Sequence, residues 1–312
     1  MRITNKMLSN NFLRDMKTNL NSLSTLQTQM ATGKQIRKAS DDPTKASKIM
    51  QINSDIASNI QYNKNIKDTS TWLDMTDTAL GQIGDVATRI QELLVSAGDA
   101  GHGVDERGAI KDEINQKVGE LSQILNTTFD GKYIFGGTRG TDKPTDSTQD
   151  AAKNTQLSLP TDPVKLSQIG SKLSVEVSQG VTMDYNVTAT DVINNGGATN
   201  LSVLLNNITS HLGSTVATDI ADLNGSDLAG IQAVMTNVLK LRSQVGAKQN
   251  GMESALARNE DQNANMTEVL TSTEDIDITE KTMEYATMQT IYTASLQTSA
   301  KVLQPSLLDY LR

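Results

Sequence analysis

Apolar residues recur at steps of three and four near both ends of the chain, which is the spacing of an amphipathic helix. Near the N-terminus the series runs through Leu13, Met16, Leu20, Leu23 and Met30. Such spacing gathers apolar side chains on one face of a helix, and that face needs a partner. The pattern therefore predicts a packed helix at each end. The C-terminal series comprises Met266, Val269, Ile276, Met283, Ala286 and Ala294.

The same periodicity predicts further helices between the two ends. Gly33 suits the end of the first helix, and Ser40, Asp41 or Asp42 can cap the next one, with Pro43 in its first turn. Pattern and caps together predict helices over 1–32, 44–97, 105–128 and 199–213, and one helix from about 226 to about 302.

The middle of the chain has a different character. The stretches LSVEVS and VTMDYNVTA alternate apolar and polar residues, which is typical of a half-buried strand. Strand-like composition occurs at 132–137, 155–160, 172–178 and 181–189. The predicted fold class is mainly α with a small β-containing insert, in which the N- and C-terminal segments form an elongated antiparallel helical bundle or coiled coil. The expected domains are an N-terminal axial segment (1–45), a helical rod (46–130 and 226–270), an outer insert (131–225) and a C-terminal axial segment (271–312).

Composition and charge narrow the class of protein. The 312 residues suffice for two or three domains, but aromatic residues make up only 3%, which suits helical bundles better than a large globular core. The net charge of −8 and the lack of a basic patch argue against a nucleic-acid partner. Residues 1–50 hold nine Lys/Arg against three Asp/Glu, and 260–312 hold the reverse, three against nine. The two ends are therefore plausible partners for each other or for neighbouring copies.

Few residues form a pattern typical of a catalytic or ligand-binding site, and we expect no enzymatic activity, no metal and no cofactor. Gly136-Gly137-Thr138 lacks the lysine of a phosphate-binding loop, so a strand end or a turn is expected there. Asp41 and Asp42 are interpreted as helix-capping residues rather than a cation site. The other candidates have structural interpretations too: solvated imidazoles for His102 and His211, a solvated helix start for Glu274, Asp275 and Asp277, and packing between helices for Trp72.

Membrane insertion is not expected, since no stretch approaches the roughly 20 apolar residues of a spanning helix. The N-terminal MRITNKMLSNNF lacks the apolar core of a Sec signal peptide, so export would use another route. Amphipathic ends can also lie on membranes, but the acidic C-terminal end favours partner helices instead.

Three stretches carry a resemblance to a known family. They are GKQIRKASDDPTKASKIM (33–50), KLRSQVGAKQNGMESAL (240–256) and the tail from EDIDITEKTMEY onward (274–312). They resemble bacterial flagellins and their hook-associated relatives, over about 1–140 and 225–312. In the second stretch the matching residues are Arg242, Gly246, Ala247, Gln249 and Asn250.

Within that family, three details resemble the hook–filament junction proteins more than flagellin. They are the opening MRIT, the sequence DGKYIFGGTRG at 130–140 and the ending LLDYLR, although the final Leu-Arg is also similar to flagellin. Flagellin, the bulk filament subunit, stays an alternative. An enzyme or binding module carried by the insert is a third, opposed by the lack of a recognisable catalytic cluster in 141–230.

The resemblance implies a structural subunit outside the cell, in the flagellum, exported through the flagellar type III channel. It implies as partners a ring of copies of the chain, a hook-associated protein on the hook side, flagellin on the filament side and a cytoplasmic export chaperone. It also implies end segments that fold only on assembly, consistent with polar residues such as Thr18 and Thr290 that interrupt the apolar pattern. The residues expected at assembly interfaces are Leu13, Met16, Leu20, Leu23, Met283, Ile291, Leu296, Leu303 and Leu307 axially, and Arg37, Asp41 and Asp42 laterally.

Overall fold

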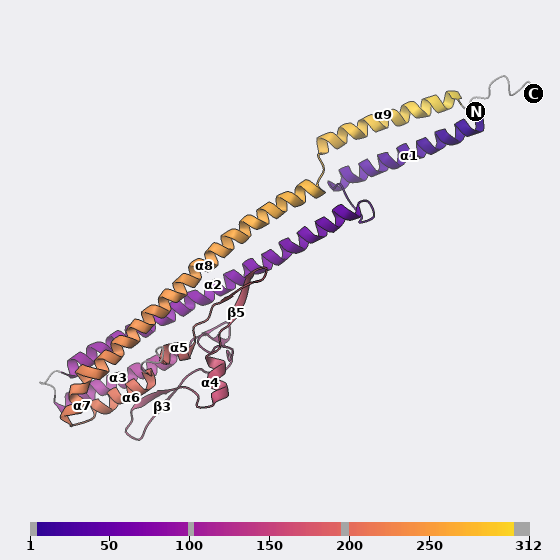
Figure 1. Cartoon of the computed structure of the whole chain (residues 1–312). Coiled ribbons are helices and arrows are strands. Elements are labelled where there is room, and N and C mark those ends of the chain that lie inside the picture. The colour runs from indigo at the N-terminus through magenta and orange to yellow at the C-terminus, as the bar shows by residue number, and fades with distance from the viewer. Residues whose placement is uncertain (1–4, 99–102, 195–199, 303–312) are drawn as a thin grey trace, which may run out of the picture. The chain divides into compact units, whose positions relative to one another are not determined.

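The computed structural model describes residues 5–98, 103–194 and 200–302 (Figure 1). It confirms a mainly α fold with a small strand-containing insert. The long helices are α1 (Asn5–Thr32), α2 (Pro43–Ala97), α3 (Val104–Leu125), α6 (Leu201–Leu212), α8 (Leu228–Glu274) and α9 (Ile278–Val302). Shorter helices are α4 (Pro163–Ile169), α5 (Ala189–Ile193) and α7 (Ala217–Asp222), which a π-helical turn, η2 (Leu223–Asp227), follows.

The chain divides into two compact units. The first comprises residues 1–58 and 261–312, and the second comprises residues 59–260. In the first unit, α1 packs along α9, so the two ends of the chain meet within one molecule (Figure 1).

The second unit contains the hydrophobic core. Its centre is formed by fully buried side chains of α2, such as Leu73, Leu80 and Ile83, against α8 residues such as Val238 and Val245. Side chains of α3, α6 and the insert complete the same cluster. Burial of so many aliphatic groups supplies the main stabilisation of this unit.

The residues of the 240–256 stretch tie α8 to α2. The Arg242 guanidinium donates two hydrogen bonds to the Asp77 carboxylate, at 2.9 and 3.0 Å, and the Gln249 amide donates one to Asp74 at 2.7 Å. A planar guanidinium matches a carboxylate in this two-point geometry, which fixes the register of the helices as well as their separation.

A buried amide network joins the same two helices to the insert. The Asn59 side chain donates to the backbone carbonyl of Asn259 at 2.9 Å, and the Asn259 side chain donates to the carbonyl of Val177 at 2.8 Å. Both asparagines are at most 5% exposed. Because a buried polar group is costly unless it is hydrogen-bonded, these contacts specify where the insert meets the helices.

The insert and the two residues of β1 (Thr128–Phe129) just before it contain three antiparallel two-stranded sheets in their described residues. They pair β1 with β2 (Lys132–Tyr133), β3 (Asp146–Gln149) with β4 (Thr155–Ser158), and β5 (Ser174–Ser178) with β6 (Val181–Asp184). The strand predicted over 132–137 ends at Tyr133, because Ile134 and Phe135 leave the ladder and are fully buried in the core. The strand predicted over 181–189 ends at Asp184, and α5 begins at Ala189.

Three local predictions had different outcomes. Gly137 adopts a φ of +59° beside Thr138, which confirms the predicted turn. The prediction of a solvated His211 is wrong, since its Nδ1 lies 2.7 Å from the Asp227 carboxylate, which is buried at the end of η2. The packing between helices expected for Trp72 is not what its ring contacts show, since the ring packs edge-on against Phe129 of β1 and Tyr185 after β6. His102 lies outside the described residues.

Candidate assembly surface

The helix pair α1–α9 has no hydrophobic core of its own. None of its described side chains is buried, although the pair carries the apolar series of both chain ends. Leu13 is 59% exposed, Leu20 is 51% exposed and Met283 is 62% exposed. Two isolated helices cover only one face of each other, so the other apolar positions stay in contact with water.

The structure places the predicted axial residues in two groups. Leu13, Leu20, Met283, Ile291 and Leu296 are exposed on the helix pair. Met16 and Leu23 are half-buried. Leu303 and Leu307 lie outside the described residues. The exposed group is the part of this surface that a neighbouring molecule could cover.

Threonines on these helices bond to their own backbone. The hydroxyls of Thr18 and Thr25 donate to the carbonyls four residues earlier, as do those of Thr282, Thr287 and Thr290 on α9. A threonine whose donor is satisfied within its helix can present its methyl group to a partner without leaving that donor unpaired. The polar positions that interrupt the apolar series are therefore compatible with a helix–helix interface.

The helices are interrupted once near each end of the chain, between α1 and α2 and between α8 and α9, and the two interruptions are hydrogen-bonded to each other. The predicted continuous helix over 226–302 is wrong, because α8 ends at Glu274 and α9 begins at Ile278. The Asp277 side chain accepts hydrogen bonds from the backbone N–H groups of Thr279 and Glu280, at 2.8 and 3.2 Å. This N-cap starts a new helix, which explains the break in a stretch that contains neither glycine nor proline.

The segment after α1 pairs with this break as a short antiparallel bridge. Gln35 N–H donates to the carbonyl of Glu274 at 2.6 Å, and Ile276 N–H donates to the carbonyl of Gly33 at 3.1 Å. The Lys34 ammonium also pairs with the Glu274 carboxylate. Among the described residues, α1 and α9 themselves share no ion pair, so the opposite charges of the ends meet at this bridge. Sequence reasoning missed it because it depends on backbone pairing.

The three predicted lateral residues differ in what they contact. The Asp41 carboxylate accepts from the backbone N–H groups of Lys38 and Arg37, at 3.0 and 3.4 Å, and the bond from Lys38 is the main cause that lowers its pKa. Asp42 caps α2 by accepting from the N–H groups of Thr44 and Lys45, at 3.0 and 3.1 Å. The exposed Arg37 guanidinium has no ion-pair partner in the described part of the chain.

In the described ranges, no group of three or more His, Asp or Glu side chains is placed to hold a metal ion. No described helix is both long and apolar enough to cross a membrane.

Comparison with known proteins shows the family to which the chain belongs. The bacterial flagellin N-terminal helical region matches residues 3–139, and the bacterial flagellin C-terminal helical region matches residues 228–311. Together they cover more than half of the chain. The chain belongs to the flagellin superfamily of flagellar structural proteins.

Individual relatives come from two branches of that superfamily. The chain is 25% identical over 277 residues to flagellar hook-associated protein 3 of Escherichia coli, covering 86% of each protein. It is also 25% identical over 201 residues to a flagellin of Clostridium tyrobutyricum, covering 64% of this chain but only about half (51%) of that flagellin. Among solved structures, hook-associated protein 3 from Legionella pneumophila shares the fold, with a TM-score of 0.61 at 13% identity over 72% of this chain and 98% of that chain.

Proposed function

We propose that this chain is a structural subunit of the bacterial flagellum that forms the junction between hook and filament. The observation that carries the proposal is the exposed apolar surface of α1 and α9, which buries none of its described side chains. Helices of this kind become stable when neighbours cover them. The similarity to hook-associated protein 3, which extends over 86% of both chains, supports the junction as the location.

In this proposal the axial segments, 1–45 and 271–312, pack against those of neighbouring copies in a ring. Leu13, Leu20, Met283, Ile291 and Leu296 are buried only in the assembly. Another hook-associated protein lies on the hook side of the ring, and flagellin lies on the filament side. A structural role of this kind requires no catalysis, and we propose that the chain is not an enzyme.

Arg37 and Asp41 are our candidates for lateral contacts. Both are exposed on the segment that precedes α2. The hydrogen bonds from Lys38 and Arg37 hold Asp41 in one orientation, and a preorganised side chain loses little entropy when a partner binds. Asp42 serves the fold by capping α2 instead.

Before assembly, the exposed face of α9 needs protection from unwanted association. We propose that a cytoplasmic chaperone covers it through Met283, Ile291 and Leu296 until the chain enters the flagellar type III export channel. An amphipathic helix laid in an apolar groove is a common mode of such recognition.

Flagellin itself is the second candidate function. The observation that favours it is the equal identity, 25%, to the flagellin of Clostridium tyrobutyricum. The shorter span of that match leaves the junction role better supported.

Deletion of the gene tests the proposal and separates it from the alternative. A junction subunit predicts cells that keep their hooks, lack filaments and release flagellin monomers into the medium. Cells that grow normal filaments would contradict the proposal. If this chain is the flagellin, its deletion leaves no flagellin in the medium.

A further inference from the structure

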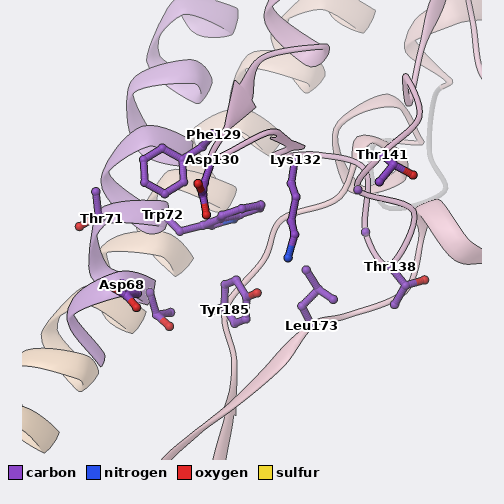
Figure 2. A pocket seen from close by; sticks show the side chains of 13 residues that line it. Asp68, Thr71, Trp72, Phe129, Asp130, Lys132, Thr138, Thr141, Leu173 and Tyr185 are labelled. Atoms are coloured by element: carbon purple, nitrogen blue, oxygen red, sulfur yellow. The ribbon is translucent and has the colours of Figure 1, made fainter. Parts of the chain in front are cut away.

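The aromatic residues of this chain are few, and three of them meet at one cavity in the second unit. The chain has one tryptophan and three phenylalanines, and Trp72 lies 5.9 Å from both Phe129 and Tyr185 between ring centres. The rings come from α2, from β1 and from the segment after β6 (Figure 2). They line an open cavity of about 780 Å³, a size typical of small-molecule sites.

Trp72 contributes its ring to this cavity. The residue is 8% exposed, and its indole N–H is fully buried without an acceptor in the described residues. A donor that has no accessible surface cannot reach a ligand in the cavity, so the hydrogen-bonding groups of the site come from other side chains.

Three charged side chains line the same cavity without forming ion pairs. Within the described ranges, Lys132, Asp68 and Asp130 make no side-chain hydrogen bond or salt bridge. Figure 2 shows Lys132 extending from the β1–β2 hairpin toward the part of the cavity bordered by Tyr185 and Leu173. Among the residues that the structure describes, the Tyr185 hydroxyl has no hydrogen-bond partner, and partial burial raises its pKa, so it is a neutral donor at pH 7.

This set of groups selects among ligand classes. Two carboxylates oppose an anionic ligand, and the Lys132 ammonium opposes a cationic one. Each hydroxyl group of a neutral ligand can both donate and accept, so the ligand can serve the ammonium and the carboxylates together. Flat aromatic rings add apolar surface for the carbon skeleton of such a ligand.

We propose that this cavity binds a neutral, hydroxyl-rich ligand of the sugar class. Trp72 and Tyr185 supply the apolar wall, and the Tyr185 hydroxyl supplies a donor. Lys132 donates to one hydroxyl oxygen, and Asp68 and Asp130 accept from the hydroxyl groups. The site lies within the second unit and is independent of the assembly surface on α1 and α9.

The single tryptophan gives a direct measurement on the full-length chain. Trp72 fluorescence would be titrated with maltose, cellobiose and chitobiose as neutral sugars, glucuronate as an anion, glucosamine as a cation and a neutral hexapeptide. The expected result is a saturable change with at least one neutral disaccharide and little change with the charged sugars or the peptide.

Matched variants locate the binding. Lys132→Met removes a charged donor and is expected to weaken binding about 10-fold or more, while Tyr185→Phe keeps the ring and weakens it about 3-fold. Tyr62→Phe removes a hydroxyl outside the cavity, next to Glu176, and should leave binding unchanged. An unchanged melting temperature would show that each variant is folded.

Three outcomes would overturn the proposal. One is the absence of a saturable change with every neutral sugar up to their solubility limits. Another is saturation by the peptide or a charged sugar alone. The third is equal affinity in the wild type and the folded Lys132→Met variant.

Discussion

The ammonium group of Lys34 lies against the carboxylate of Glu274, where the segment after α1 meets the end of α8. The lysine side chain is half exposed, so the ion pair alone contributes little to stability. The backbone bonds on either side of it, from Gln35 to Glu274 and from Ile276 to Gly33, hold the two breaks together. The geometry of these breaks sets where α1 ends and where α9 begins.

Gly33 is the residue on which this bridge depends most. Its φ of +71° lies in the left-handed region, so Gly33→Ala should destabilise the bridge by about 1–2 kcal/mol. Gly246→Ala, inside α8 where an added Cβ meets nothing within 4 Å, should instead stabilise its helix by about 0.5–1 kcal/mol. Hydrogen exchange at the amides of Gln35 and Ile276 measures the first effect. Equal protection in wild type and Gly33→Ala would refute it.

The exposed leucines should affect assembly more than folding. We expect Leu20→Ser to change the free energy of unfolding by less than about 0.5 kcal/mol, because the side chain is already half in water. The variant should nevertheless fail to restore filaments to a deletion strain. Leu80→Ala, at a fully buried core position, should cost about 2–5 kcal/mol. Urea unfolding and a motility assay on the same variants separate the two effects, and full complementation by Leu20→Ser would count against an axial role.

Asp42 should act through the start of α2. Asp42→Ala removes the acceptor for the N–H groups of Thr44 and Lys45 and should cost about 1 kcal/mol of local stability. Asp42→Asn keeps a side-chain oxygen and should retain most of it. Exchange rates of the two amides report the difference. If both variants exchange alike, the cap is not what stabilises this end of the helix.

The pair of His211 and Asp227 should make stability depend on pH. Burial raises the pKa of Asp227 above its ordinary value, despite the hydrogen bond to His211. The folded state therefore binds more protons than the unfolded state from about pH 3.9 upward, so this group's contribution to stability falls as pH rises through its folded pKa. Asp227→Asn should flatten that slope in urea midpoints measured from pH 4 to 7.

Asp222→Asn is the control for this measurement. Asp222 lies near the pair and raises the pKa of Asp227 slightly through its charge, so its removal should leave most of the slope. A wild-type midpoint that does not fall across this range, or an Asp227→Asn profile parallel to it, would show that the buried Asp227 carboxyl does not titrate in this way.

The helices of this chain could be predicted well because their signals are local. The expected helix at 44–97 corresponds to Pro43–Ala97, and that at 199–213 corresponds to Leu201–Leu212. Both helices begin with a side chain that caps the first turn, Asp42 for α2 and Asn200 for α6, and both have apolar residues at helical spacing. The resemblance of the two end stretches to flagellin-type sequences was equally local, and the family comparison confirmed it.

The predictions that were wrong depend on tertiary contacts. Nothing in the periodicity of 226–302 marks the break at Asp275–Asp277, which is stabilised by pairing with Gly33 and Gln35 more than 200 residues away. His211 meets Asp227 only because the π-helical turn presents the carboxylate to it. Strand β3, DSTQ, is exposed at all four positions and shows no alternation, since its partner β4 supplies the buried side chains.

We expect α1 and α9 to depend on neighbouring subunits for their stability. Hydrogen exchange on the free full-length chain, compared with the same chain in the assembled flagellum, tests it most directly. We predict fast exchange over Asn5–Thr32 and Ile278–Val302 in the free chain, slow exchange at core positions such as Leu80 and Val238, and strong protection of all of them after assembly. End helices that are as protected in the free chain as the core of the second unit would contradict the account.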